Sequence, residues 1–216
     1  MKLFQTTNKW KNWWTHRQID WKKHYLASFN HPHRKVISAA LRLFPWLSLF
    51  EIGVGGGANL VRIIKDFPGR QIGGADVNKD AIALCEETFK GGYFKVGSGD
   101  DLMISDKSVD VILTDMTLIY VSPLKINKYL NEIKRLARDY VVLCEFHSTS
   151  WWNRLALYLN EGYYAHNYRK RLQKLGFHDI LIYKLKPEDW PEEDGTAGHE
   201  PRKSFASIII TKVPKR

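Results

Sequence analysis

Apolar positions follow two different rhythms along the chain, and the rhythm changes near residue 45. Upstream, apolar and aromatic side chains recur three and four positions apart, which predicts helices over residues 8–29 and 32–44. Pro32 suits the first turn of the second helix, and Pro45 ends it. Downstream, short apolar runs alternate with helical stretches, so the two parts are expected to differ in architecture.

The downstream part predicts strands and helices in turn. Strands are expected over residues 47–54, 70–77, 92–98, 108–115 and 139–146, and helices over 58–67, 79–89, 123–137 and 163–175. Asn78 is expected to cap the second of these helices and Ser122 the third. The last two strands, 178–185 and 203–213, have no helix between them. The alternation predicts a parallel sheet covered on both faces, and the missing crossover predicts an antiparallel last strand.

Together these elements predict an α/β fold, a single doubly wound, mostly parallel seven-stranded sheet with an antiparallel last strand and an N-terminal helical cap. The cap is assigned to residues 1–44 and the sheet domain to residues 45–216, with a lid insertion at residues 148–168. A chain of 216 residues is long enough for one sizeable core and short for two enzyme domains.

The apolar runs and the cysteine content of the chain indicate its cellular compartment. The apolar runs are shorter than the roughly 20 residues that span a bilayer, and the first residues lack the apolar core of a secretory signal. Cys85 and Cys144 are the only cysteines, too few for a disulfide framework, and both fall on apolar faces that predict core positions. A cytoplasmic protein is therefore expected.

Basic residues are concentrated near the N-terminus. The chain has 33 Lys and Arg against 23 Asp and Glu, which gives a net charge of +10. Residues 1–35 hold eight of these Lys and Arg and a single acid, Asp20, together with four of the eight Trp. Such a segment can bind nucleic acid, anionic lipid or a phosphorylated molecule, or it can be a solvated helix face.

Glycines cluster where the first predicted strand turns into a helix. Residues 51–57 are EIGVGGG, and glycines at this point allow a tight turn and a close approach of a ligand to the backbone. The following helix offers free N–H groups and the positive end of its dipole. Asp76 ends the second predicted strand, where an acid can bind both hydroxyls of a ribose.

Over roughly residues 47–213, these segments resemble the class I S-adenosylmethionine-dependent methyltransferases. The glycine loop of that family, (E/D)-x-G-x-G-x-G, is matched by residues 51–57, and its ribose-binding acid by Asp76. A family stretch of the type GDAEDLPFxDxSFDVV is matched by GSGDDLMISDKSVDVI at residues 97–112. The family sheet also ends with an antiparallel seventh strand.

The resemblance implies S-adenosyl-L-methionine as the methyl donor and S-adenosyl-L-homocysteine as the product. It implies that the cofactor-binding residues are Glu51, Gly53, Gly55 and Gly57 at the methionine end, Asp76 and Val77 at the ribose, Ser98, Gly99 and Asp100 around the adenine, and Asp115 with Met116 after the fourth strand. Ser98 is a departure, because the family usually has an Asp there that holds the adenine amino group.

NAD is the alternative cofactor, because Gly53, Gly55 and Ala58 also fit the dinucleotide-binding fingerprint. Two features favour the methyl donor. Glu51 precedes the glycines, within reach of the amino group of a methionine moiety, and the chain ends in paired strands. An NAD-binding oxidoreductase and a non-catalytic binding module are the less favoured alternatives.

Groups for the methyl acceptor are expected after the fourth and fifth strands, because ligands bind outside the carboxyl ends of such sheets. The catalytic candidates are His147 as general base, Tyr120 on the acceptor side, and Asp115. A solvated loop histidine and a packed aromatic are the alternatives for the first two. Asp115 stands where the D-P-P-Y motif of nucleobase amino methyltransferases would begin, but both prolines are missing, which disfavours base methylation.

No metal site is predicted, because the spacing of Asp115 with Glu145 or His147 is not diagnostic of one. The HPHR sequence at residues 31–34 is expected to cap a helix and to face a carboxylate or phosphate.

Aromatic residues outside the minimal sheet predict a covered pocket. Trp10, Trp14, Trp21 and Tyr25 are expected to form a lid, with Trp151, Trp152, Tyr163, Tyr164, His166 and Tyr168 on its other side. The alternative is that these aromatics only join the lid to the sheet.

The predicted function is methyl transfer to oxygen or nitrogen of a small-molecule acceptor, aromatic or apolar. An RNA methyltransferase whose Trp residues stack on bases is one alternative. A methyltransferase for a lipid or quinone at the membrane surface, reached by a basic amphipathic helix, is the other. The oligomeric state is left open.

Overall fold

The computed structural model describes residues 7–24, 26–190 and 205–215. Its strands are β1 (Ser48–Ile52), β2 (Gln71–Asp76), β3 (Tyr93–Val96), β4 (Val109–Asp115), β5 (Ala137–Phe146), β6 (His178–Lys184) and β7 (Ala206–Lys212). They form one sheet in the order β3-β2-β1-β4-β5-β7-β6. The pairs among β1 to β5 are parallel, and β7 runs antiparallel to both β5 and β6. The predicted doubly wound sheet with its antiparallel last strand is confirmed.

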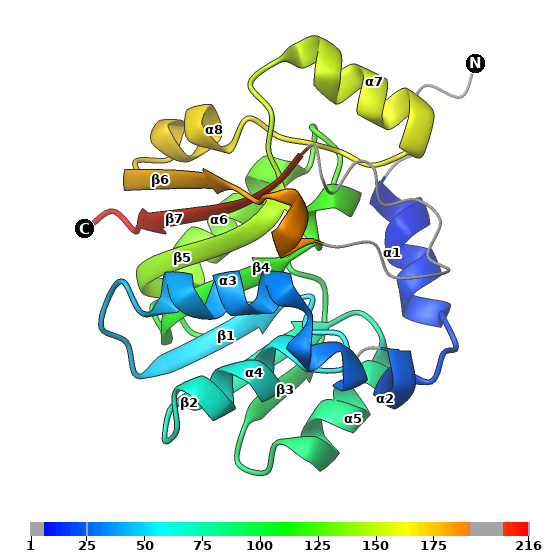
Figure 1. The fold of residues 1–216 in the computed structure, drawn as a ribbon, viewed down its shortest axis with the longest axis vertical. Coiled ribbons are helices and arrows are strands. Elements are labelled where there is room, and N and C mark those ends of the chain that lie inside the picture. The colour runs from blue at the N-terminus through cyan, green and yellow to red at the C-terminus, as the bar shows by residue number, and fades with distance from the viewer. Residues whose placement is uncertain (1–6, 25, 191–204, 216) are drawn as a thin grey trace.

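Helices cover both faces of the sheet (Figure 1). They are α1 (Thr7–His16), α2 (Trp21–His24), α3 (Pro32–Leu41), α4 (Ala58–Asp66), α5 (Lys79–Thr88), α6 (Ile126–Leu136), α7 (Trp151–Glu161) and α8 (Tyr168–Lys174), with 3-10 turns η1 (Leu26–Asn30), η2 (Leu118–Tyr120) and η3 (Pro187–Asp189). Apolar residues of α3, α4 and α5 share one buried cluster, and those of α6 and α8 share another. The sheet therefore lies between two separate cores, which is why β1 and most of β5 are buried throughout.

The helix caps explain where several elements begin. Asn78 caps α5 as predicted, because its side chain accepts hydrogen bonds from the backbone N–H groups of Asp80 and Ala81. The carbonyl oxygen of Ser122 accepts from the N–H groups of Lys125 and Ile126, and α6 begins at Ile126, three residues later than Pro123 predicts. Cys85 and Cys144 are fully buried, as expected.

Two predicted helices are wrong in extent. The helix expected over residues 8–29 is divided into α1, α2 and η1, so its aromatic side chains do not lie on one continuous face. The helix expected over 163–175 is shorter, since α8 begins at Tyr168, and the chain before it contains the unpredicted helix α7. Gly162, with φ of 76°, ends α7 in the left-handed conformation that glycine adopts without strain.

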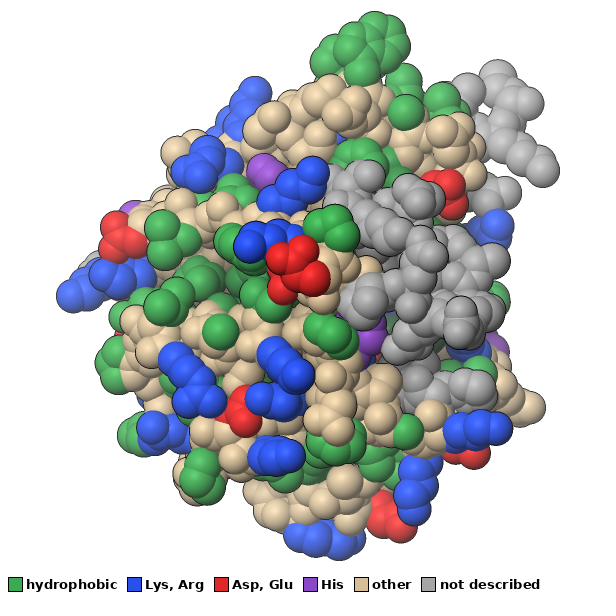
Figure 2. All heavy atoms as spheres, in the orientation of Figure 1, with side chains coloured by type: hydrophobic (Ala, Val, Ile, Leu, Met, Phe, Trp, Pro, Cys, Tyr) green, Lys and Arg blue, Asp and Glu red, His purple; other side chains and the backbone are tan. Residues whose placement is uncertain are grey.

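The N-terminal segment lies at one end of the sheet. In Figure 1, α1 and α2 lie on the right, and the C-terminus of the chain lies on the left, at the opposite end of the sheet. Figure 2 shows Lys and Arg side chains spread over the viewed face, with few acids among them. Among the described residues, no helix has both the length and the apolar character needed to cross a membrane.

Candidate active site

The glycine loop after β1 has a backbone that side chains would not tolerate. Gly53, Gly55 and Gly57 have φ angles of 77°, 51° and 80°, in the left-handed region. The N–H of Gly53 donates to the carbonyl oxygen of Ala75 at 2.7 Å, which holds the loop against β2. A Cβ at position 53 would lie 2.0 Å from Oγ1 of Thr117, so this turn also needs glycine for space.

Asp76 binds the glycine loop from the end of β2. One of its carboxylate oxygens accepts from the N–H of Gly55 at 3.0 Å, and the other accepts from the N–H of Asn78 at 2.9 Å. Burial raises the pKa of Asp76, while these backbone hydrogen bonds oppose that rise. The acid and the loop therefore form one rigid unit at the carboxyl ends of β1 and β2.

A cavity of about 530 Å³ opens above this unit. Of the predicted site residues, its lining includes Gly53, Gly55, Asp76, Val77, Ser98, Gly99, Asp115, Met116 and Tyr120. The structure thus brings together residues from the ends of β1, β2, β3 and β4. Four predicted residues are not part of the lining: Glu51, Gly57, Asp100 and His147.

Glu51 is buried behind the cavity and does not line it. Its Oε1 accepts from Nδ2 of Asn59 at 2.6 Å, and its side chain is closed off from solvent. Burial raises the pKa of Glu51 to about 8. Glu51 therefore does not face the cavity directly, which differs from the contact that the resemblance implies.

Gly57 and Asp100 serve other contacts. A Cβ on Gly57 would lie 2.4 Å from the ring of Phe89, so this glycine allows α4 and α5 to pack closely. Asp100 forms an ion pair with Lys128 at 3.2 Å. Its neighbour Ser98 lines the cavity with its hydroxyl 3.1 Å from that of Tyr129.

His147 lies outside the cavity wall. It follows β5 as predicted, but its Nδ1 accepts from the N–H of Tyr168 at 3.3 Å, on the side of the sheet covered by α8. Burial lowers the pKa of His147. The imidazole is therefore not among the groups that line the cavity, and the role of His147 as general base stays a prediction.

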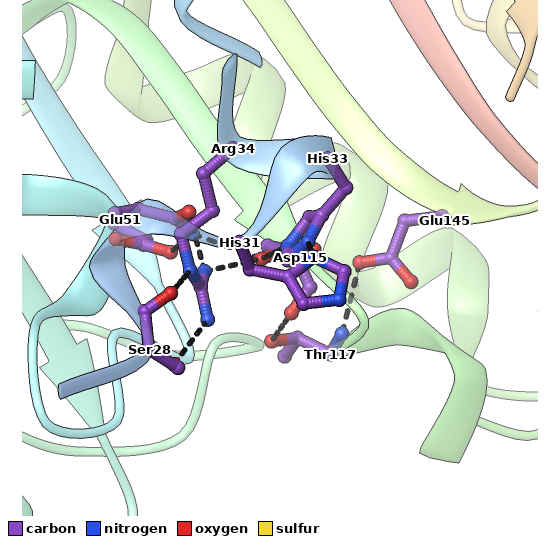
Figure 3. A network of polar contacts seen from close by, with 9 residues as sticks. Ser28, His31, His33, Arg34, Glu51, Asp115, Thr117 and Glu145 are labelled. Atoms are coloured by element: carbon purple, nitrogen blue, oxygen red, sulfur yellow. Dashed lines mark hydrogen bonds and ion pairs between the residues drawn. The ribbon is translucent and has the colours of Figure 1, made fainter. Parts of the chain in front are cut away.

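A polar network that the sequence analysis did not identify lies at the base of the cavity (Figure 3). Oδ2 of Asp115 accepts from Nη1 of Arg34 at 3.1 Å and from Nδ2 of Asn59 at 3.0 Å, and it lies 3.0 Å from Nε2 of His33. Nδ1 of His33 in turn lies 2.5 Å from Nδ1 of His31. The HPHR segment therefore faces a carboxylate, as expected, and the carboxylate is Asp115.

Two opposite effects set the charge of this network. Burial alone would raise the pKa of Asp115, but His33 and Arg34 hold it well below its usual range, so Asp115 is a carboxylate. Arg34 is anchored from the other side, where its guanidinium donates to the carbonyl oxygen and the hydroxyl of Ser28. Glu145 is different: burial raises its pKa to about 8, and Oε1 accepts from the N–H groups of Thr117 and Leu118.

Aromatic rings form the opposite wall of the cavity. The lining includes Trp10, Trp13, Trp14, Trp21, Tyr120, Tyr163 and Trp190. The Trp10 ring lies 5.1 Å from that of Tyr120 and 5.9 Å from that of Tyr163, and Trp14 lies 5.5 Å from Tyr120. Helix α1, η2 and the segment after α7 thus meet in one aromatic cluster, and the chain near η3 adds Trp190.

The predicted aromatic lid is correct in part. Trp10, Trp14 and Trp21 line the cavity, and Tyr25 lies outside the described residues. On the other side only Tyr163 lines it. Trp151 and Trp152 stack on each other and are 53% and 64% exposed. The remaining three, Tyr164, His166 and Tyr168, are buried elsewhere in the fold and do not line the cavity.

The fold agrees with comparisons to known proteins. Residues 49–140 match the family model described as a methyltransferase domain. No curated protein matches the chain significantly. Among solved structures, the chain is similar to geranyl diphosphate C-methyltransferase from Streptomyces coelicolor, at 14% identity and a TM-score of 0.68, over 98% of each chain.

Two further structures are similar over most of their length. One is magnesium protoporphyrin IX methyltransferase from Synechocystis PCC 6803 with bound S-adenosylmethionine, at 12% identity and a TM-score of 0.63, over 99% of this chain and 100% of that one. The other comes from the complex of the Haloferax volcanii Trm112 methyltransferase activator with a methyltransferase, at 19% identity and a TM-score of 0.66, over 87% and 92%.

The sheet order and the position of the glycine loop with its acid are those of a Rossmann-like methyltransferase fold, and residues 49–140 of this chain match a methyltransferase domain.

Proposed function

We propose that the protein transfers a methyl group from S-adenosylmethionine to oxygen or nitrogen of a small, flat or apolar molecule. The observation that carries this proposal is the lining of the cavity of about 530 Å³: strand ends on one side and aromatic rings on the other. Cavities of this size are typical of sites for small molecules. Aromatic rings favour a flat or apolar occupant, because they bury a large apolar area.

The donor half of the cavity is assigned to the strand ends. The glycine loop provides a cradle that a Cβ would fill at Gly53, and Asp76 has a carboxylate at the cavity wall, so these residues fit the methionine end and the ribose. We assign Val77 to the ribose as well, and Ser98 and Gly99 to the adenine. Asp100 is left out of this assignment because it pairs with Lys128.

Asp115 and Met116 are assigned to the boundary between the two halves. Met116 lines the cavity with φ of 49°, a conformation that turns the chain away from β4 immediately after the strand ends. Asp115 accepts hydrogen bonds from Arg34 and Asn59, and Asn59 also donates a hydrogen bond to Glu51. We assign Glu51 to holding this polar network in place at the bottom of the cavity, and not to direct contact with the methyl donor.

The acceptor half is assigned to Tyr120 and the aromatic wall. When bound, S-adenosylmethionine supplies an electrophilic methyl group, and the protein's contribution is to align the acceptor and exclude water. Tyr120 contacts Trp10 and Trp14, so it is positioned to pack against an acceptor. The names of two similar structures, for geranyl diphosphate and magnesium protoporphyrin IX, support an acceptor of the small-molecule class.

The test uses methyl-labelled S-adenosylmethionine with host extract, separated afterwards into RNA, protein, lipid and small-metabolite fractions. We expect label in the small-metabolite or organic fraction with the wild type and none with Asp76→Ala. Label confined to RNA or protein would overturn the proposed acceptor class. Calorimetry with S-adenosylhomocysteine on the same samples reports separately whether the donor half binds.

A further inference from the structure

The side chain of Asn78 connects two helices that come from opposite ends of the cavity wall. Its Oδ1 accepts from the N–H groups of Asp80 and Ala81, which caps α5. Its Nδ2 donates to the carbonyl oxygens of Trp14 at 2.8 Å and of Arg17 at 2.9 Å, at and just beyond the last turn of α1. Asn78 is 1% exposed, so the amide that caps one helix is buried against the end of another.

The backbone of the same residue holds the acid assigned to the ribose. The N–H of Asn78 donates to Oδ1 of Asp76 at 2.9 Å, and Oδ2 of Asp76 accepts from the N–H of Gly55. A carboxylate oxygen can accept more than one hydrogen bond, so both oxygens remain able to bind a hydroxyl group. Val77, between the acid and the amide, lines the cavity. One hydrogen-bonded turn therefore fixes the position of Asn78 relative to the carboxylate.

The segment that Asn78 binds is part of the aromatic wall. Trp14 and Arg17 line the cavity, and the Trp14 ring lies 5.5 Å from that of Tyr120. The guanidinium of Arg17 lies over the rings of Trp13 and Trp14, at 4.3 and 4.8 Å from their centroids. The last carbonyl groups of a helix have no partner within that helix, and Asn78 supplies a donor to one of them. The position of this wall thus depends on the residue that follows the donor site.

We propose that Asn78 is a positioning residue that couples α1, with its aromatic rings, to the donor site. This inference rests on the proposed function, because it takes Asp76 as the ribose-binding acid. A ribose bound to Asp76 stabilises the turn that orients Asn78, and Asn78 in this orientation holds Trp14 and Arg17 over the cavity. Such coupling is reciprocal, so the loss of the two hydrogen bonds to α1 must also weaken binding of the donor. Attachment of α1 in turn excludes water from the bound donor.

The variant Asn78→Ser removes the hydrogen bonds to α1 and keeps a cap on α5. Serine and asparagine are similarly good caps, and Ser150 caps α7 in this way by accepting from the N–H of Asn153. The shorter side chain lacks the amide group that donates to α1. The matched control is Asn167→Ser, because Asn167 caps α8 by accepting from the N–H of Lys170 and does not line the cavity.

Hydrogen–deuterium exchange of the full chain, with and without saturating S-adenosylhomocysteine, measures the attachment of α1. In the wild type and in Asn167→Ser, we expect the ligand to slow exchange both in the glycine loop, residues 53–57, and in residues 7–17. In Asn78→Ser, the ligand should slow exchange in the loop and have little effect on residues 7–17. Its affinity should also fall about tenfold, on the scale of one or two neutral hydrogen bonds.

Equal slowing of residues 7–17 in Asn78→Ser and the wild type would overturn the proposal. A residue that only caps α5 would change the stability of the fold and would not change the response of α1 to the ligand. Asn78→Asp is the second variant, for use if serine caps α5 too weakly for the chain to fold. Aspartate caps as well as asparagine, but it presents an acceptor oxygen to the two carbonyl oxygens, so the ligand should again fail to slow residues 7–17.

The wild type separates this proposal from the proposed function. If S-adenosylhomocysteine slows exchange in neither the glycine loop nor residues 7–17, the assigned donor site is refuted, and the coupling with it. If the ligand slows exchange in the loop and not in residues 7–17, the donor site stands and the coupling is overturned.

Discussion

The two halves of the cavity are built in different ways. The donor half comes from consecutive strand ends, where the glycine loop, Asp76 and Ser98 follow directly from β1, β2 and β3. The acceptor half comes from segments far apart in sequence: the rings of Trp10 in α1 and Tyr120 in η2, for example, lie 5.1 Å apart. The donor half is therefore a product of local turn geometry, and the acceptor half is a product of tertiary packing.

This difference predicts how each half responds to substitution. A change in the glycine loop strains the backbone of the sheet itself. A change at Trp10, Trp13 or Trp14 alters the lid and leaves the sheet intact, because these rings belong to neither of the two cores on the sheet faces.

The largest expected effect is on the glycine loop. Gly53→Ala must accommodate both a φ of 77° and a Cβ 2.0 Å from Thr117, so we expect a loss of about 3 kcal/mol or more in the free energy of unfolding. Gly69→Ala is the matched control, because its φ is 80° but nothing lies within 4 Å of the added carbon. It should lose only about 1 kcal/mol. Equal losses in urea denaturation would contradict the steric role of Thr117.

The next effect concerns the acid of the donor half. Asp76→Ala should weaken binding of S-adenosylmethionine about 10- to 100-fold, as expected for a lost charge-assisted hydrogen bond. Asp100→Ala is the control, because Asp100 pairs with Lys128 and does not line the cavity. Its affinity should remain within about twofold. Calorimetry that finds both variants equally weakened would place Asp100 at the donor after all.

A smaller effect is expected at the aromatic wall. Trp10→Ala removes a ring that contacts both Tyr120 and Tyr163, so the KM for the acceptor should rise about tenfold while donor affinity is unchanged. Trp152→Ala removes an equally large ring that is 64% exposed, and it should leave both constants unchanged. The idea of an acceptor wall fails if Trp10→Ala changes only the donor affinity.

The smallest effect is on the pH dependence of stability. Burial raises the pKa of Glu145 to about 8, so the folded chain keeps a proton that the unfolded chain releases above about pH 4.5. Stability should therefore fall as the pH rises from about 5 to 8. Glu145→Gln removes this titrating group but can still accept from the N–H groups of Thr117 and Leu118. Between pH 6 and 8.5, a range chosen around the raised pKa of about 8, the denaturation temperature of this variant should therefore fall less with pH than that of the wild type.

Glu132→Gln is the control for this measurement. The Arg135 side chain lowers the pKa of Glu132, so this carboxylate is ionised in both states above about pH 4.5. Its loss should shift the denaturation temperature by a constant amount across the same range. A slope that is unchanged in Glu145→Gln would show that Glu145 is ionised in the folded chain.

The sequence was informative where geometry is local. The strand–glycine–helix pattern predicts the loop at Gly53 and Gly55, the acid Asp76 and the cap Asn78, because each depends on residues nearby in the chain. The alternation of strands and helices predicts the sheet and its antiparallel end for the same reason. Helix boundaries are less predictable, as at α6, which begins three residues after Pro123.

The acceptor half could not be predicted in the same way. His147 follows a strand on the expected edge, but the packing of α8 turns it toward Tyr168. Trp151 and Trp152 are aromatic residues of the kind expected in a lid, but they lie exposed in the first turn of α7. The HPHR segment did suggest a carboxylate partner, but the identity of that partner as Asp115 depends on how α3 docks against the sheet.

The most direct test of the two-half cavity is a crystal structure with S-adenosylhomocysteine. We expect the ribose hydroxyls on Asp76, the adenine beside Ser98 and Gly99, and the sulfur directed toward Tyr120. A ligand bound away from Asp76, or a sulfur directed away from the aromatic wall, would contradict the division of the cavity into donor and acceptor halves.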